Sequence, residues 1–81
     1  MKGNKGYNGW KNYNQWNVAL WINNDEGLYQ LAQDFINANA NRNDAARDMM
    51  LFLELAGQDK TPDGVPYNKT NIRAAMVGMP H

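Results

Sequence analysis

The sequence predicts an all-α fold: a small single domain of three to four short helices with a flexible N-terminal arm. Three observations lead to this prediction. At 81 residues the chain has room for one domain. Apolar residues recur at helical spacing over most of it. Residues 1–11 hold three glycines and show no such period, so we assign 1–11 to the arm and 12–81 to the helical domain.

The apolar run WNVALWI, residues 16–22, is compatible with two structures. Because it holds Val18 and Ile22, it fits a buried strand as well as a helix. No second strand is evident to pair with it, and an isolated strand leaves its backbone hydrogen bonds unmade. We therefore predict a helix from about Tyr13 to Asn23. Its apolar side chains surround most of the helix, which predicts burial on several sides.

The clearest helical period follows this first helix. Asn24 or Asp25 is a good N-cap for the second helix. The apolar positions then follow the i, i+3, i+4, i+7, i+8 pattern of an amphipathic helix: Leu28, Leu31, Ala32, Phe35 and Ile36. The asparagine-rich stretch 37–43 ends the helix, because asparagine competes for backbone hydrogen bonds.

A third helix is predicted over residues 44–56. Asn43 is its expected N-cap, and Gly57 stands where a C-terminal glycine belongs. The apolar residues expected on its broad apolar surface are Ala46, Met49, Met50, Phe52, Leu53 and Ala56.

A turn and a short fourth helix complete the chain. The sequence TPDG, residues 61–64, has proline and glycine at the second and fourth positions of a β-turn. Asn68 or Thr70 then caps the helix. Its apolar stripe is Ile72, Ala75, Met76 and Met79.

The core of so short a chain needs additional support. There is no cysteine for a disulfide or a thiolate metal site. Dense aromatic packing or self-association remains, and we expect the tryptophans and tyrosines of residues 12–29 to form the core. Asn17 and Asn23 in this stretch then need hydrogen-bond partners, from loop backbone or from another chain. If the stretch is exposed instead, it is an interaction surface; the candidate residues are Trp10, Tyr13, Asn17, Trp21 and Asn23.

The methionines allow two interpretations. Soft, flexible side chains line adaptable grooves for partner helices, and they also fill gaps in small cores. The residues concerned are Met49, Met50, Met76 and Met79. Either role favours binding of a protein partner or of a second copy of the chain, which would cover the apolar surface.

The net charge is zero, with eight lysines and arginines against eight acids. This balance argues against strong nonspecific binding to nucleic acid and against an acidic mimic of DNA. The distribution is uneven, because residues 12–59 hold seven acids and residues 1–11 hold none.

The arm offers an alternative function. Its lysines alternate with aromatic residues, a combination that binds single strands by contacting phosphates and stacking on bases. The candidate residues are Lys2, Lys5, Tyr7, Trp10 and Lys11. The competing interpretation is a solubilising tail in which Tyr7 or Trp10 docks on the domain.

One short motif resembles a metal site. Asp59, Thr61, Asp63 and Gly64 match the opening of a calcium loop of the EF-hand kind. The loop should close with a glutamate at its twelfth position, where this chain has Thr70. We therefore predict a plain turn, with no metal and no cofactor.

Catalytic groups are also scarce. Asp44 and Asp48 lie four residues apart, but beside Arg47 they fit a solvated helix start. His81 is the single histidine and the last residue, and the chain has neither serine nor cysteine. We predict no catalytic residue and no enzymatic activity.

Residues 12–29 also carry a family resemblance. The sequence is similar to a small uncharacterised family of phages and mobile elements with the pattern N-Y-x-T-W-N-V-x-L-W-I-x-N-D-E-x-x-Y. The matching residues are Asn12, Tyr13, Trp16, Asn17, Val18, Leu20, Trp21, Ile22, Asn24, Asp25, Glu26 and Tyr29, while Gln15 stands in place of Thr. Residues 60–65 and the stretch around Ile72 are similar to later segments. The resemblance implies a phage-like source and carries no activity.

Together these observations predict a non-enzymatic interaction protein. It acts through helix faces on a protein partner, either itself or a host or phage protein, and we expect a homo-oligomer. No apolar run is long enough for a membrane span and no signal-peptide core is present, so we expect a cytoplasmic protein. The resemblance to phage proteins implies that this is the cytoplasm of a host cell. Weak binding of single-stranded nucleic acid through the arm is the alternative.

Overall fold

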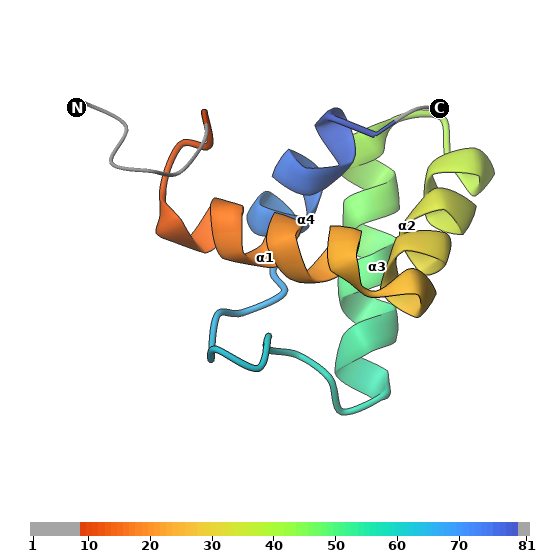
Figure 1. Ribbon diagram of the computed structural model, residues 1–81. Helices are drawn as coiled ribbons and strands as arrows, with labels where there is room; N and C mark the ends of the chain where they lie inside the picture. Colours follow the sequence, from red (N-terminus) through yellow and green to blue (C-terminus); the bar gives the residue numbers. More distant parts are fainter. Residues whose placement is uncertain (1–8, 80–81) are drawn as a thin grey trace.

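The computed structural model describes residues 9–79, which form four helices (Figure 1). They are α1 (Tyr13–Asn24), α2 (Glu26–Ala38), α3 (Arg42–Leu55) and α4 (Lys69–Val77). The predicted all-α class is confirmed, and all four predicted helices are present. In this part of the chain no helix has the length and apolar character needed to cross a membrane.

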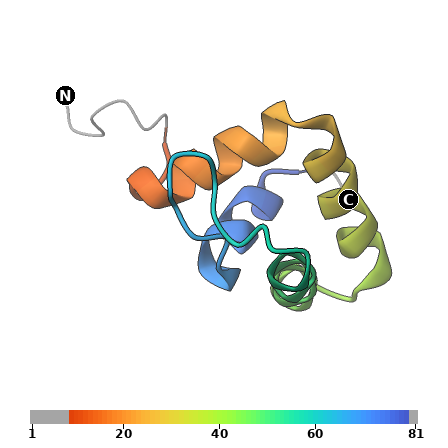
Figure 2. The same cartoon turned by 90° about the horizontal axis from the view of Figure 1, so that it is seen from below.

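Each of the four helices packs against two others, so that the contacts form a closed ring. α1 contacts α2 and α4, and α3 contacts the same two helices. The view in Figure 2 shows the loop between α3 and α4 passing across α1 on its way to the start of α4. This crossing brings residues that are more than forty positions apart in the sequence into contact.

Every helix begins at an asparagine or aspartate whose side-chain oxygen accepts a backbone N–H of the first turn. The capping residues are Asn12, Asp25, Asn41 and Asn68. The predicted cap of the third helix, Asn43, is wrong. Asn41 accepts the Asp44 N–H at 2.8 Å. The earlier start also places Arg42 in α3, where its guanidinium donates to the carbonyl oxygens of Met76 and Met79 at the end of α4.

The end of α3 follows the prediction. Gly57 has φ +75°, a conformation that glycine adopts without strain. Its N–H donates to the Glu54 carbonyl, and the Gln58 N–H donates to the Leu53 carbonyl at 2.8 Å. These two bonds form a Schellman motif, which satisfies carbonyls that the helix leaves unpaired.

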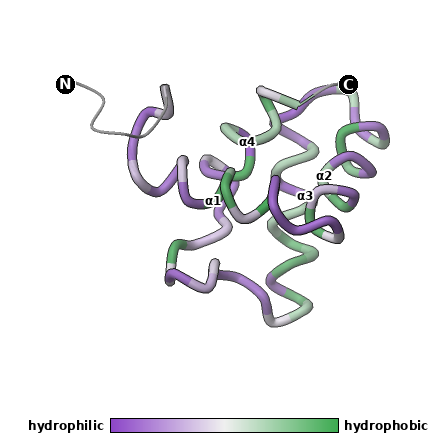
Figure 3. Tube along the Cα trace, viewed as in Figure 1, coloured by the Kyte–Doolittle hydropathy of each residue, from purple (hydrophilic) through white to green (hydrophobic). Residues whose placement is uncertain are grey.

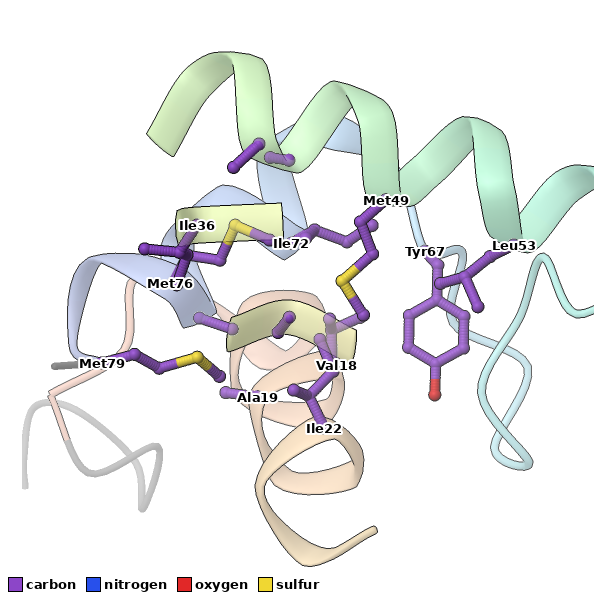
Figure 4. Packing of buried hydrophobic residues seen from close by; sticks show 14 of the residues in the cluster. Val18, Ala19, Ile22, Ile36, Met49, Leu53, Tyr67, Ile72, Met76 and Met79 are labelled. Atoms are coloured by element: carbon purple, nitrogen blue, oxygen red, sulfur yellow. The ribbon is translucent and has the colours of Figure 1, made fainter. Parts of the chain in front are cut away.

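The core is built from aliphatic residues, alanines and methionines contributed by all four helices and the α3–α4 loop (Figure 4). The largest apolar side chains that are fully buried in it are Ile22, Ile36, Met49, Leu53, Ile72, Met76 and Val18. The predicted α4 stripe is fully confirmed. Met49, Met76 and Met79 are buried and Met50 is half-buried against the core, so in this chain the methionines fill the core.

The expectation of an aromatic core is wrong. Trp10, Trp16 and Trp21 are half-buried, and Tyr67 is the aromatic residue that the described part of the chain buries. Buried alanines explain the difference, because small side chains let helices approach closely and leave little volume for an indole ring. These alanines are Ala19, Ala32, Ala45, Ala46 and Ala75.

Candidate interaction surfaces

The α3–α4 loop is folded around Thr61. Its N–H donates to the Val65 carbonyl, and its carbonyl accepts the Gly64 N–H, both at 2.8 Å. Gly64 has φ +88°, so glycine suits this position. The predicted turn at residues 61–64 is confirmed. The Thr61 hydroxyl is buried and also accepts the N–H groups of Asp63 and Val65.

Asn17 of α1 holds this loop in place. Its side chain is 0% exposed. The Asn17 Oδ1 accepts the Thr61 hydroxyl at 2.7 Å, and the Asn17 Nδ2 donates to the Asp63 carboxylate at 2.7 Å. A buried amide is costly without partners and stabilising with them. Asn17 therefore joins the helix to the loop through both ends of its amide.

Asp63 accepts a second hydrogen bond, from the Trp21 indole Nε1 at 3.0 Å. The hydrogen bonds from Asn17 and from Trp21 favour the ionised carboxylate and lower the pKa of Asp63. We refer to Asn17, Trp21, Thr61 and Asp63 as the α1–loop cluster. Two residues of the calcium-like motif, Thr61 and Asp63, therefore have a structural role in this cluster.

Among residues 9–79 no group of three acidic or histidine side chains is placed to hold a metal.

The five residues predicted as an interaction surface are not equivalent. Asn17 is buried and bonded within the chain, so it offers no contact surface. Trp21 is half-buried and belongs to the same cluster. Tyr13 and Asn23 are exposed. Trp10 packs against the core, which confirms the docking suggested for it.

A different surface is strongly apolar. On α3, Leu51 is 46% exposed, Phe52 is 47% exposed and Leu55 is 91% exposed. Residues 51, 52 and 55 lie on one side of a helix, and we refer to them as the α3 face. In Figure 3 the hydrophobic colouring continues along α3 toward its C-terminal end.

The α3 face continues toward α2. The rings of Phe52 and Phe35 meet edge to face, with centroids 6.1 Å apart. Phe52 also lines a hollow of about 430 Å³ together with Leu28 and Leu31 of α2, and Asp25 and Gln58 add polar groups to its lining. The apolar surface therefore spans two helices.

Sequence reasoning missed the outward position of the α3 face, although a signal was present. Residues 49–53 are five consecutive apolar residues. At 100° per residue they extend around the whole helix, so one packed side cannot bury all of them. The prediction placed Phe52 on a broad apolar surface of this helix and did not include Leu51 or Leu55.

The acidic pair on α3 forms ion pairs. Arg47 lies 3.8 Å from Asp44 and 3.5 Å from Asp48, and all three side chains are substantially exposed. This is the solvated helix start that the sequence indicated. The arm residues Lys2, Lys5 and Tyr7, together with His81, lie outside the described residues.

Comparison with known proteins adds a family. A family model described as a family of unknown function (DUF7249) matches residues 3–80. No curated protein and no solved structure matches the chain.

Proposed function

The chain belongs to DUF7249, a family of unknown function, and we propose that it is a non-enzymatic interaction protein that self-associates through the α3 face. The exposure of Leu51, Phe52 and Leu55 is the observation that carries this proposal. Contiguous apolar side chains on a small soluble domain mark contact surfaces, because burying them against a partner removes them from water. The half-buried Phe35 ring extends the same surface.

A second copy of the chain is the proposed partner. An apolar face meets its own copy without charge mismatch, and such isologous contacts close into a two-fold dimer. The net charge of zero adds no long-range repulsion between copies. Self-association also supplies the additional burial that a chain of 81 residues needs. As part of this proposal, the protein works in the host cytoplasm, as the phage-like sequence motif implies.

Sedimentation equilibrium tests the proposal. The wild-type chain should show a mass that rises from monomer to dimer between micromolar and millimolar concentrations. The double variant Leu51→Gln/Leu55→Gln should stay monomeric over the same range. Both side chains are exposed, so the variant should keep its helical circular dichroism spectrum.

Val77→Gln is the control. Val77 is 59% exposed on α4 and lies outside the α3 face. It tests the loss of an exposed aliphatic side chain elsewhere, and it should dimerise like the wild type. A wild-type chain that is monomeric throughout, or an α3-face variant that dimerises equally well, would overturn the proposal.

A further inference from the structure

A basic hollow of about 540 Å³ lies on the surface between the start of α1, the start of α3 and the first half of α4. α1 and α4, which both contribute to it, pack against each other (Figures 1 and 2). The residues that line the hollow are Lys11, Gln15, Asn43, Lys69, Thr70, Arg73 and Ala74.

The charges of this hollow have one sign. Lys11, Lys69 and Arg73 are cations, and no carboxylate is among the lining residues. Both of the other described arginines are engaged elsewhere. Arg42 binds the carbonyls at the end of α4, and Arg47 makes both ion pairs found among residues 9–79. The hollow therefore gathers cations that the described chain does not neutralise by ion pairing.

The start of α4 adds to this positive potential. A helix N-terminus carries a partial positive charge, which acidic residues in the first turn usually offset. α2 and α3 follow that rule with Glu26 and Asp44, whereas α1, whose start also lines the hollow, has no acidic residue in its first turn. α4 has no acidic residue in its first turn and begins with Lys69. Asn68 caps one N–H group of this turn, and no carboxylate in the first turn offsets the positive end of the helix, which favours a bound anion.

Two tryptophans are sequence neighbours of residues that line the hollow. Lys11 and Gln15 directly follow and precede Trp10 and Trp16 in the chain, and these two rings line a neighbouring hollow of about 190 Å³. Cations next to aromatic rings are the combination by which proteins hold single strands, through phosphate contacts and base stacking. Both rings pack within the chain and are half-buried, so each keeps a partly exposed edge. A single strand can place its phosphates on the cations and an unpaired base against such an edge, which a free phosphate cannot do.

We propose that the hollow formed by Lys11, Lys69 and Arg73 binds the phosphate groups of a single-stranded nucleic acid whose bases reach Trp10 and Trp16. Arg73 contributes a planar donor group that matches two phosphate oxygens, and the lysines contribute mobile point charges. Thr70 and Asn43 add neutral donors. This site is separate from the α3 face, so the two proposals stand or fall independently.

Fluorescence anisotropy with a labelled oligothymidylate tests this site at about 50 and 200 mM salt. The wild-type chain should bind, and its affinity should weaken at the higher salt. Lys69→Gln/Arg73→Gln should lower the affinity at least tenfold at about 50 mM salt. The salt slope should fall by about 1.4, since each lost phosphate contact contributes roughly 0.7.

Arg47→Gln/Lys60→Gln is the matched control. It removes one lysine and one arginine, changes the net charge equally, and leaves the hollow intact. All four substituted side chains are at least partly exposed, so both variants should fold. The control should bind with wild-type affinity. Equal weakening in both variants, absence of binding by the wild type at the lower salt, or equally tight binding of a duplex would overturn the proposal.

Leu51→Gln/Leu55→Gln separates the two proposals. If it remains monomeric and still binds the oligothymidylate with wild-type affinity, the nucleic-acid site is independent of self-association. Loss of oligonucleotide binding in this variant would contradict a site confined to the hollow.

Discussion

The α1–loop cluster and the α3 face depart from the usual arrangement of polar and apolar residues in opposite ways. In the cluster, a fully buried amide is satisfied by a hydroxyl and a carboxylate from a distant loop. On the α3 face, large apolar side chains lie exposed to water. The first arrangement is complete within one chain, and the second is completed by burial against a partner. The difference separates residues that maintain the fold from residues available for contact.

The largest expected effect is the loss of Asn17. Asn17→Ala removes the side-chain amide that bonds Thr61 and Asp63 of the loop, and it leaves a cavity in a packed region. It should lower the free energy of unfolding by about 2–4 kcal/mol. Urea denaturation followed by circular dichroism measures this change. Asn23→Ala, an exposed position on the same helix, should change stability by no more than about 0.5 kcal/mol. Equal effects at the two positions would remove the distinction between them.

Thr61→Val should have the next largest effect. Valine keeps the shape but removes the hydroxyl that bonds Asn17 and accepts the backbone of Asp63 and Val65. Leaving these groups without their partner should cost about 1–3 kcal/mol in unfolding free energy. Thr61→Ser keeps the hydroxyl and should retain more stability than the valine variant. A serine variant no more stable than the valine variant would show that the methyl group matters and the hydrogen bonds do not.

Acid should weaken the same cluster. The hydrogen bonds from Asn17 and Trp21 lower the pKa of Asp63 in the folded chain, so the unfolded chain takes up the proton first as pH falls. The contribution of Asp63 to stability is therefore complete above its ordinary pKa and is lost as the pH drops through the lower, folded pKa. Urea midpoints measured from about pH 5 downward should fall less steeply in Asp63→Asn than in the wild type. Identical pH profiles would contradict this role.

The smallest effect on folding should come from the α3 face. Leu51→Gln/Leu55→Gln should change the unfolding free energy by no more than about 0.5 kcal/mol per site in a dilute sample. In a concentrated sample the wild type gains stability from association, and the variant does not. Denaturation at two protein concentrations measures both effects. A large loss in the dilute sample would mean that these leucines serve the monomer core.

The elements with strong local signals could be predicted from the sequence. The α2 period, the Gly57 helix end and the turn at residues 61–64 depend on neighbouring residues, and all three are confirmed. The α3 cap was misplaced because Asn41 and Asn43 are both good caps. Capping by Asn41 includes Arg42 in the helix, and Arg42 then contacts the end of α4, a tertiary contact that the local sequence does not show.

The sites were harder to predict because they join distant parts of the chain. The sequence showed that Asn17 needed a partner, but Thr61 is 44 residues away and became its partner only through the path of the loop. The core composition was mistaken for a related reason. Whether an indole ring fits in the core depends on the distance between the helices, which the buried alanines set. The periodicity of the sequence does not give that distance. The basic hollow likewise unites Lys11 with Lys69 and Arg73 through tertiary packing.

The most direct test of the central claim is a series of ¹H–¹⁵N correlation spectra of the wild-type chain at increasing protein concentration. Signals of Leu51, Phe52 and Leu55 should shift in a saturable way, together with that of Phe35. Signals of Thr61 and of the Asn17 side-chain amide should stay in place. Concentration-independent spectra, or shifts centred on the α1–loop cluster, would contradict the assignment of the α3 face to self-association.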